Sequence, residues 1–456
     1  MPNEQPIKRP GAAPGLETVA RRRLWLRAFA RGLGSGLDDL CSLTAEEMGK
    51  SEWEVLSSEL MPLMASIKWH RRRLGRLLRP RRVSGGALWQ FAQRQRVHRR
   101  PLGRVGIIAT WNYPIQLLGI QLVQAIAAGN RVVVKPSEHS PESQRRLLEI
   151  ARDAGLPPGT LDWTEPTREA GARLLAEHEL DHVLFTGSTE VGRLVGATCA
   201  EGLVSSTLEL SGRDSAIVLD DADPALAAES VWHALVMNAG QTCMAPRRVL
   251  TTPAVHDAFC TELARRAEAT DPVRLVQPEE VSRCRSLVEE AIEAGGRCVP
   301  AWTGPLDERT MRPVAIMDCP PEASVVEGRH FGPLLAVLRC ADLDDVLRRH
   351  REVDQVLATS VFTSRPRRVE PLLDELGSGI VTINDCVLPA GHPSSPITGR
   401  SASGWGSSQG VEGLMALTRP VVLSRTGRIG RLPTEEPGPR IQDFLKGMMR
   451  RGAGRG

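Results

Sequence analysis

The feature that most constrains this chain is an alternation of short β-branched runs with longer segments of helical periodicity, beginning at Arg104. The predicted elements follow in chain order: a strand at 105–110, a helix at 115–128, a strand at 131–135, a helix from Pro141, a strand at 182–186 and a helix from Ser188. Strands joined through helices of ten or more residues are typical of βαβ units. The pattern therefore predicts an α/β fold with parallel sheets.

A second series of the same kind runs from Ala216 to about Ile383, with predicted helices at 225–238, 253–269 and 279–294. Two amphipathic helices are predicted before the first series, at 17–32 and 44–79. A chain of 456 residues is too long for one compact core. We therefore expect two domains, each built on its own parallel sheet.

The segments outside these two series differ from them in composition. Residues 88–101 are polar and poor in helix signals, and the stretch around Leu417–Ser424 is short and β-rich, so we expect the two segments to pair as strands. The predicted domain boundaries are 1–87 with 102–211, then 212–414, then the paired strands 88–101 and 415–426, and last a basic flexible tail at 427–456.

Charge and cysteine usage exclude several function classes. The formal net charge of +4 is too small to argue for a nucleic-acid partner. The nine cysteines form no C-x-x-C pair and no zinc-like Cys/His spacing, so we expect reduced thiols, a cytoplasmic protein and no bound metal. No apolar segment resembles a signal peptide or reaches the length of a bilayer span.

The densest chemistry follows the predicted helix that ends at Asn238. Gly240 comes next, and Gln241, Thr242 and Cys243 follow it. A thiol in a loop just past a helix can face a cleft, where its own backbone N–H is free to bond an incoming oxygen. Free cysteines are more often buried and inert, so residue type alone leaves Cys243 open between a nucleophile and a core residue.

Two other segments supply complementary groups. Glu209 lies near the end of a predicted strand, where carboxylates line the clefts of open α/β sheets and can act as general bases. Asn112 follows the first strand and offers a neutral amide that can hold an oxyanion without a buried charge. Taken singly, a solvent-facing glutamate and a turn asparagine explain these residues equally well.

Six short runs, in this order and at these separations, resemble the aldehyde dehydrogenase superfamily: PLGRVGIIATWNYP, AAGNRVVVKPSE, FTGSTEVG, ELSGRD, NAGQTC and FGP. The resemblance extends from about residue 20 to 425, and the chain is most similar to the shorter, class 3-like members. It implies two Rossmann-like α/β domains, one cofactor-binding (1–87 and 102–211) and one catalytic (212–414), with a small β bridging element that supports a homodimer or a pair of dimers.

The resemblance also implies a chemistry. Cys243 attacks the aldehyde carbon as a thiolate, and the Asn112 amide with the Cys243 backbone N–H stabilises the oxyanion. NAD(P)+ accepts the hydride, and Glu209 activates the water that hydrolyses the thioester to a carboxylic acid. A free thiol has a pKa of about 8.5, so a nearby base or dipole has to activate it. The partner is then a small-molecule aldehyde, whose identity scattered tunnel residues do not reveal.

The cofactor site rests on other positions. No G-x-G-x-x-G follows the first strand, but Gly187 and Ser188 open a helix whose N-terminus suits a pyrophosphate. By resemblance, Lys135 and Glu138 hold the adenosine ribose, and a carboxylate there disfavours a 2′-phosphate, so NAD is expected over NADP. The resemblance places five more residues at the cofactor: Trp111, Ser137, Gly192, Leu210 and Phe331.

The chain also departs from the family pattern. Arg329 stands where the family usually has the glutamate that holds the nicotinamide ribose, and the usual Pro-Phe-Gly-Gly is replaced by Pro396–Gly399. Residues 164–167 replace a glycine-rich turn at the adenine pocket. Two alternatives therefore stay open: a CoA-acylating aldehyde dehydrogenase, which generally lacks the hydrolytic glutamate, and a catalytically impaired member that acts as a binding or scaffold protein.

The C-terminal tail adds one minor expectation. A short helix is predicted at Ile441–Arg451, and its apolar side chains form a weakly amphipathic face. A solvated tail is the preferred interpretation, with weak membrane contact through this helix as the lesser alternative.

Overall fold

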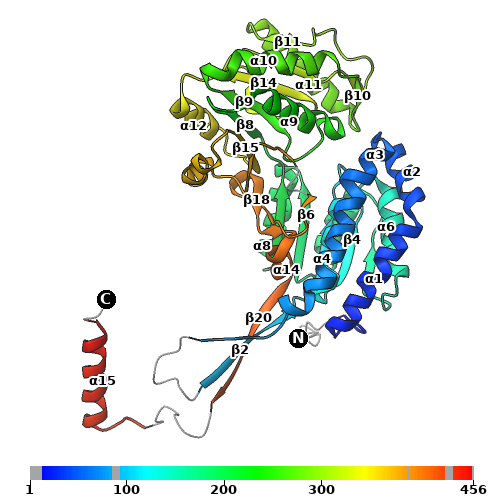
Figure 1. Cartoon of the computed structure of the whole chain (residues 1–456). Helices are drawn as coiled ribbons and strands as arrows, with labels where there is room; N and C mark the ends of the chain where they lie inside the picture. The colour runs from blue at the N-terminus through cyan, green and yellow to red at the C-terminus, as the bar shows by residue number, and fades with distance from the viewer. Residues whose placement is uncertain (1–12, 85–92, 388–390, 427–434, 454–456) are drawn as a thin grey trace. The chain divides into compact units, whose positions relative to one another are not determined.

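The computed structural model describes residues 13–84, 93–387, 391–426 and 435–453 (Figure 1). The chain divides into two compact units, one of residues 1–77 and 100–419 and one of residues 78–99 and 420–456. The larger unit contains two main sheets, each flanked by helices, which confirms the predicted α/β class.

The first sheet of the larger unit has six strands in the order β18-β7-β6-β3-β4-β5. Its strands are β3 (Arg104–Ile108), β4 (Arg131–Lys135), β5 (Leu161–Trp163), β6 (His182–Gly187), β7 (Ser205–Leu210) and β18 (Gly404–Trp405). All neighbours pair in parallel except β18, which runs antiparallel to β7 with Gly404 opposite Glu209. A Cβ at Gly404 would lie 2.0 Å from the Leu208 carbonyl oxygen, so only glycine allows this edge strand to approach.

Helices connect these strands as the alternation predicts: α5 (Gln116–Ala128), α6 (Pro141–Asp153), α7 (Arg168–Glu177) and α8 (Thr189–Glu201). Their ends follow local chemistry. Gly129 ends α5 in the left-handed region, and the hydroxyls of Thr167 and Ser188 accept backbone N–H bonds as the N-caps of α7 and α8. Leu174 of α7 and Val195 of α8 pack on the sheet in one buried cluster.

The second sheet has seven strands in the order β11-β13-β14-β9-β8-β15-β16, parallel apart from β11. Its strands are β8 (Asp214–Val218), β9 (Pro246–Thr251), β11 (Arg297–Val299), β13 (Val314–Met317), β14 (Leu334–Arg339), β15 (Ala358–Phe362) and β16 (Ile380–Ile383). Its helices are α9 (Pro224–Val236), α10 (Pro253–Glu268), α11 (Pro278–Glu293), α12 (Leu343–Arg351) and α13 (Leu373–Leu376).

Alternate residues of the second sheet face two separate cores. Ala216 and Val218 pack with α9 and α10, whereas Ile217 and Leu219 pack with α11 and α12. Successive side chains of a strand point to opposite faces, so this division makes the sheet the middle of three layers. A sheet covered on both faces requires nearly continuous apolar strands. The AIV run of β8 has this character, and so does the VVV run of β4 in the first sheet.

The N-terminal helices correct one prediction. The predicted helix at 44–79 is not continuous: α2 (Leu37–Met48) ends at Gly49 in the left-handed region, and a new helix begins at Glu52 behind a Ser51/Glu54 capping box. This second helix runs through α3 (Glu52–Glu54), a π-helical segment η1 (Val55–Leu60) and α4 (Met61–Leu77). The helix predicted at 17–32 is present as α1 (Val19–Ser35).

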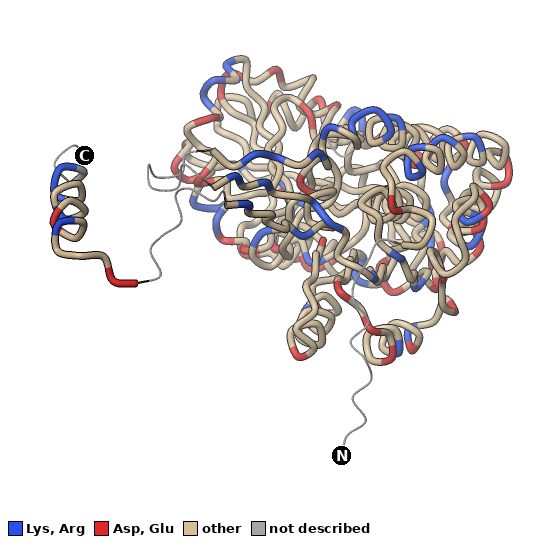
Figure 2. The backbone as a smooth tube through the Cα atoms, turned by 90° about the horizontal axis from the view of Figure 1, so that it is seen from below, with Lys and Arg blue, Asp and Glu red and all other residues tan. Residues whose placement is uncertain are grey.

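Short elements complete the larger unit. They are β10 (Val273–Arg274) paired with β12 (Thr310–Met311), β17 (Ile397–Thr398) paired with β19 (Ser407–Ser408), helix α14 (Gly410–Ala416), and the 3-10 turns η3 (Met237–Gly240), η4 (Ser324–Glu327), η5 (Pro366–Arg368), η6 (Glu370–Leu372) and η8 (Ser401–Ser403). Blue and red segments are interspersed around this unit in Figure 2, as the small net charge leads one to expect.

The smaller unit is built around a three-stranded sheet in the order β1-β2-β20. Its strands are β1 (Arg81–Arg82), β2 (Gln93–Pro101) and β20 (Thr418–Thr426), and helix α15 (Pro439–Ala453) covers the predicted tail helix. Residues 88–92 of the predicted bridging strand and residues 427–434 and 454–456 of the predicted tail lie outside the described residues. Among the described helices, none combines the length and hydrophobicity that crossing a bilayer would require.

Candidate active site

The turn between β3 and α5 carries Asn112 in a buried position. Its side-chain oxygen accepts a hydrogen bond from the Thr110 hydroxyl at 3.1 Å, and its Nδ2 donates to the Gln241 carbonyl at 3.0 Å. An amide nitrogen carries two N–H groups, and the bond to Gln241 uses one of them. The bond also joins the turn to the segment that carries Cys243, two residues further along the chain.

The segment that carries Cys243 is held by several polar contacts. Asn238 has a φ of 53° and donates from its Nδ2 to the carbonyls of Asn112 and Gln241, at 2.8 and 3.0 Å. The Tyr113 hydroxyl lies 2.7 Å from the Thr242 hydroxyl. A Cβ at Gly240 would lie 2.5 Å from the Gly332 backbone, so glycine is required there. These contacts give the thiol segment one defined conformation.

The buried Arg247 guanidinium closes the other side of this segment. It donates to the carbonyls of Gly240, Thr242 and Gly332, all at 2.9 to 3.0 Å. A planar guanidinium fits several carbonyls in a fixed geometry. No motif in the sequence marks Arg247, which stands at the start of a strand and reads as an ordinary basic residue.

Cys243 is half-buried, unlike most of the nine free cysteines, which are fully buried. Burial raises the pKa of its thiol, and the carboxylates of Glu209 and Asp214 raise it further. The backbone N–H groups of Cys243 and Met244 act in the opposite direction. The thiol is thus mainly protonated at neutral pH, and attack on a substrate needs a base beside it.

Glu209 lies near the end of β7 and is buried. Its Oε2 accepts a hydrogen bond from the Ser408 hydroxyl at 2.8 Å, while Oε1 has no partner among the described residues. Burial raises the pKa of this carboxyl, and the bond from Ser408 lowers it. A buried carboxylate oxygen without a partner is unusual and marks a position where water or a ligand can bind. Sequence reasoning missed Ser408, because it lies in β19, 199 residues after Glu209, and only the folded chain brings it there.

The predicted catalytic residues therefore come together. The Asn112 amide and the Cys243 segment are joined by a hydrogen bond, and the N–H of Gly212, three residues after Glu209, donates to the Cys243 carbonyl at 3.0 Å. A second carboxyl, Asp214, also raises the pKa of the Cys243 thiol. Burial raises its pKa to about 8, and its Oδ1 accepts from the Leu357 N–H at 2.8 Å.

The residues predicted at the ribose lie together at the end of β4. Lys135 and Glu138 form an ion pair with 2.5 Å between Nζ and Oε2, and the Glu138 side chain is 40% exposed. Ser137 is buried, and its N–H donates to Gln144 Oε1 at 2.8 Å. The pair leaves a partly exposed carboxylate where a ribose hydroxyl could donate.

The residues predicted at the pyrophosphate lie at the start of α8. Gly187 ends β6, and Ser188 caps the helix by accepting from the Val191 N–H at 3.3 Å. A Cβ at Gly192 would lie 2.4 Å from Leu210 Cδ2, so the helix packs directly on β7. The free N–H groups and dipole of such a helix start favour an anion.

Phe331 and Trp111 bring the second sheet's loop to the first sheet. Their ring centroids are 5.7 Å apart in an edge-to-face arrangement. Arg329, two residues before Phe331, is exposed and ion-paired with Glu327 at 2.6 Å. The position that the resemblance assigns to a ribose-holding glutamate is thus occupied by a cation that is already paired.

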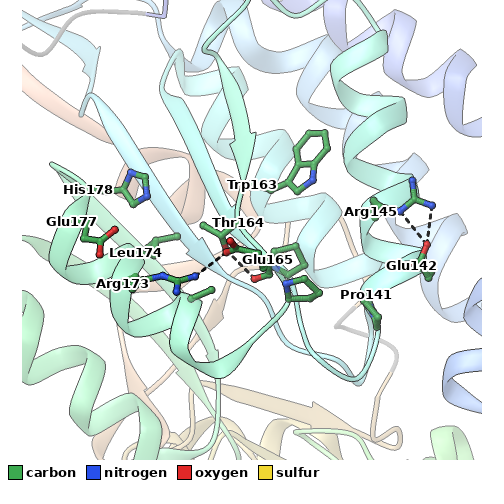
Figure 3. Close-up of a pocket in the computed structure, with 13 residues that line it drawn as sticks. Pro141, Glu142, Arg145, Trp163, Thr164, Glu165, Arg173, Leu174, Glu177 and His178 are labelled. Atoms are coloured by element: carbon green, nitrogen blue, oxygen red, sulfur yellow. Dashed lines mark hydrogen bonds and ion pairs between the residues drawn. The ribbon is translucent and has the colours of Figure 1, made fainter.

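A pocket of about 680 Å³ lies beside the carboxyl ends of β4 and β5 (Figure 3). Its lining includes Pro136, Trp163, Glu165 and Pro166, and Arg173 of α7 pairs with Glu165 at 3.0 Å. The pocket therefore contains part of the 164–167 segment in which the chain departs from the family's glycine-rich turn.

Comparison with known proteins agrees with this geometry. Residues 15–422 match the model of the aldehyde dehydrogenase family. Over 427 residues the chain is 30% identical to a 4,4'-diapolycopene aldehyde oxidase of a Methylomonas species, which covers 91% of this chain and 79% of the relative. It is 28% identical to the dimeric NADP-preferring aldehyde dehydrogenase of Mus musculus, over 84% of this chain and 85% of the relative.

A solved structure extends the likeness to three dimensions. The crystal structure of a Mycobacterium tuberculosis aldehyde dehydrogenase complexed with NAD+ superposes with a TM-score of 0.83 at 27% identity, covering 92% of this chain and 88% of that one. The family match spans nearly the whole chain, and the two sheets with their flanking helices agree with it. This chain belongs to the aldehyde dehydrogenase family.

Proposed function

We propose that this protein oxidises an aldehyde to a carboxylic acid with NAD+ through a thioester on Cys243. The observation that carries the proposal is the buried Glu209 carboxylate, which has one oxygen without a partner among the described residues and acts electrostatically on the Cys243 thiol. A base of this kind serves two proton transfers, one from the thiol and one from the hydrolytic water.

The first half of the reaction uses the thiol and the amide. Glu209 takes the Cys243 proton, and the sulfur forms a bond to the aldehyde carbon, whose carbonyl electron pair moves to oxygen. The second N–H of the Asn112 amide and the Cys243 backbone N–H hold this oxyanion. Bound NAD(P)+ would supply the hydride acceptor that turns the thiohemiacetal into a thioester.

The second half returns the thiol. Glu209 first releases the Cys243 proton to solvent and then takes a proton from water; the resulting hydroxide attacks the thioester carbon, the carbon–sulfur bond breaks to release the carboxylic acid, and the thiolate takes the proton back from Glu209. The raised pKa of Glu209 favours this role, because a stronger base removes a proton more readily. Ser408 keeps one carboxylate oxygen oriented through its 2.8 Å bond.

The residues present fit a nicotinamide dinucleotide. Ser188 and the start of α8 would hold the pyrophosphate, and Lys135 with Glu138 would hold the adenosine ribose next to the β4–β5 pocket. Trp111, Ser137, Gly187, Gly192, Leu210 and Phe331 complete the proposed cofactor site. We favour NAD over NADP because the partly exposed Glu138 carboxylate repels a 2′-phosphate.

Assembly and compartment are further parts of the proposal. β20 carries Val422 and Leu423 with more than half of each side chain exposed, which suits an edge strand that a second copy covers. We therefore propose a homodimer, or a pair of dimers, through the three-stranded sheet. Nine free cysteines suit the reducing cytoplasm.

One assay tests the proposed function. Aliphatic and aromatic aldehydes are supplied with NAD+ or NADP+, and reduced cofactor and acid are measured for the parent protein and for Cys243→Ala. We expect the parent to form both products with NAD+ and Cys243→Ala to form neither. Acyl-CoA in place of acid when CoA is added would replace this proposal with the acylating alternative, and absence of saturable NAD+ and NADP+ binding would replace it with a scaffold.

A further inference from the structure

A buried ion pair lies behind the turn that carries Asn112. The ammonium of Lys50 pairs with the carboxylate of Glu59, and their side chains are 1% and 0% exposed. Lys50 follows Gly49 in the break between α2 and α3, and Glu59 lies in the π-helical segment η1. π-helical turns are rare and frequently occur at functional sites. The mechanism proposed above uses neither residue.

The pair holds the turn from both ends. Lys50 Nζ donates to the Asn112 carbonyl at 2.9 Å and lies 4.0 Å from the centre of the Tyr113 ring. Glu59 Oε2 accepts from the backbone N–H groups of Ile115 and Gln116, both at 2.9 Å. The two charges therefore fix the backbone immediately before and after residues 113 and 114.

Stability alone is a weak reason for such a pair. Removing two charges from water is costly, and replacement of a buried ion pair by apolar residues often leaves a protein as stable or more stable. Oxyanion stabilisation, in contrast, depends on a donor held to within a fraction of an ångström. A turn clamped by charges at both ends meets that requirement.

We propose that Lys50 and Glu59 are positioning residues that hold the Asn112 turn so that the Asn112 amide is aimed at the oxyanion above Cys243. The inference rests on the proposed function, which assigns the oxyanion to that amide. The Asn238 side chain supports the same carbonyl from the other side, through its 2.8 Å bond to the Asn112 oxygen.

The test separates positioning from stability by comparing single variants, which leave one buried charge unpaired, with a double variant, which removes both charges. Lys50→Met and Glu59→Gln are made singly and together, and the glutamine keeps an oxygen for the Ile115 and Gln116 N–H groups. Thermal melting, kcat, aldehyde KM and the NAD+ dissociation constant are measured. The exposed pair Arg285–Glu289, changed to Met and Gln, serves as the matched control.

We expect each single variant to melt well below the parent, because it buries an unpaired charge. The double variant should regain most of the lost melting temperature, keep the parental NAD+ affinity and still lose about ten- to a hundred-fold in kcat. A double variant with parental melting temperature and parental kcat would show that the pair is only structural and would overturn the proposal.

A cycle with Asn112→Ala identifies the route of the effect. If the pair acts through the amide, adding Lys50→Met and Glu59→Gln to Asn112→Ala should lower kcat no further, whereas independent losses that multiply would overturn the inference. Asn112→Ala alone with parental kcat would instead refute the oxyanion assignment of the proposed function. If the double variant does not fold, Glu59→Gln alone takes its place and is assayed below its own melting transition, and unchanged kcat in that variant would also overturn the proposal.

Discussion

Two buried carboxylates of this enzyme have opposite surroundings. Glu59 has both oxygens engaged, one by Lys50 and the other by two backbone N–H groups. Glu209 has one oxygen bonded to Ser408 and the other without a partner among the described residues. Both oxygens of Glu59 are bound by groups of its own protein, whereas Glu209 has an unused oxygen at the place where we propose that water reacts.

The difference distinguishes a carboxylate that supports the fold from one that is able to act as a general base. A buried carboxylate whose two oxygens already bind a cation and backbone N–H groups serves to hold that backbone in place. A buried carboxylate with an unused oxygen has a raised pKa and a free acceptor, which are the two properties of a general base.

The largest expected effect on kcat comes from removing the Glu209 carboxylate. Glu209→Gln keeps an oxygen for Ser408 but loses the base, so kcat should fall by about 10²- to 10⁴-fold while the melting temperature stays at or above that of the parent. Steady-state kinetics and thermal melting measure the two quantities.

The same variant has a second readout with the opposite sign. Since the Glu209 charge raises the pKa of Cys243, its loss should lower that pKa and move the pH profile of iodoacetamide alkylation to lower pH. Mass spectrometry should also find acyl groups retained on Cys243. If Glu209→Gln kept the parental kcat, Glu209 would not be the base, and Glu59 and Glu209 would not differ in role.

The next effect sharpens the role of Ser408. Its hydroxyl stabilises the ionised form of Glu209, so Ser408→Ala should raise the Glu209 pKa. The acidic limb of the kcat/KM profile should move to higher pH by the same amount. A pH series with parent and variant measures the shift, and coincident profiles would mean that Glu209 does not govern that limb.

A variant of Asp214 tests whether a buried carboxyl with a raised pKa lowers the melting temperature at high pH. Burial raises its pKa from 3.8 to about 8, so the folded state favours the protonated form. This contribution is complete below pH 3.8 and is lost as the pH rises through about 8. Asp214→Asn should therefore melt about 2–4 °C above the parent at pH 9, with a smaller difference at pH 6. Equal differences at both pH values would contradict the assignment.

The smallest expected effect concerns cofactor binding near Arg329. Arg329→Glu places a carboxylate two residues before Phe331, where it can accept from a ribose hydroxyl, and one hydrogen bond of this kind should lower the NAD+ KM by about two- to ten-fold. Arg329→Gln is the control for loss of the cation alone. If both variants lower KM equally, removal of the Arg329–Glu327 pair is the cause.

Much of the site could be predicted because its residues lie in ordered local patterns. Asn112, Glu209 and Cys243 stand at strand or helix ends, where βαβ alternation alone places side chains at a sheet edge. Their roles came from the resemblance, and their proximity needed the structure. The helix predicted at 44–79 failed because apolar periodicity continues across Gly49, although the Ser51-x-x-Glu54 capping box is visible in the sequence.

The remaining residues could not be predicted, because their partners are far away in the chain. Ser408 lies three residues after the edge strand β18, and its bond to Glu209 spans 199 positions of the chain. Lys50 is one of only five lysines in an arginine-rich chain, and this scarcity was its one signal. An ammonium that fits between a carbonyl, a ring and a carboxylate is evident only when all three are in place.

The late position of the edge strand β18 in the chain affects how the site forms during translation. The ribosome makes β7 long before it makes residues 404–408, so a growing polypeptide can assemble the thiol segment while Glu209 still lacks the serine that orients it. The carboxylate that we propose as the base is therefore oriented only late in translation, and a proteolytic cut that releases residues after Gly399 should lower the activity of a molecule whose nucleophile is intact.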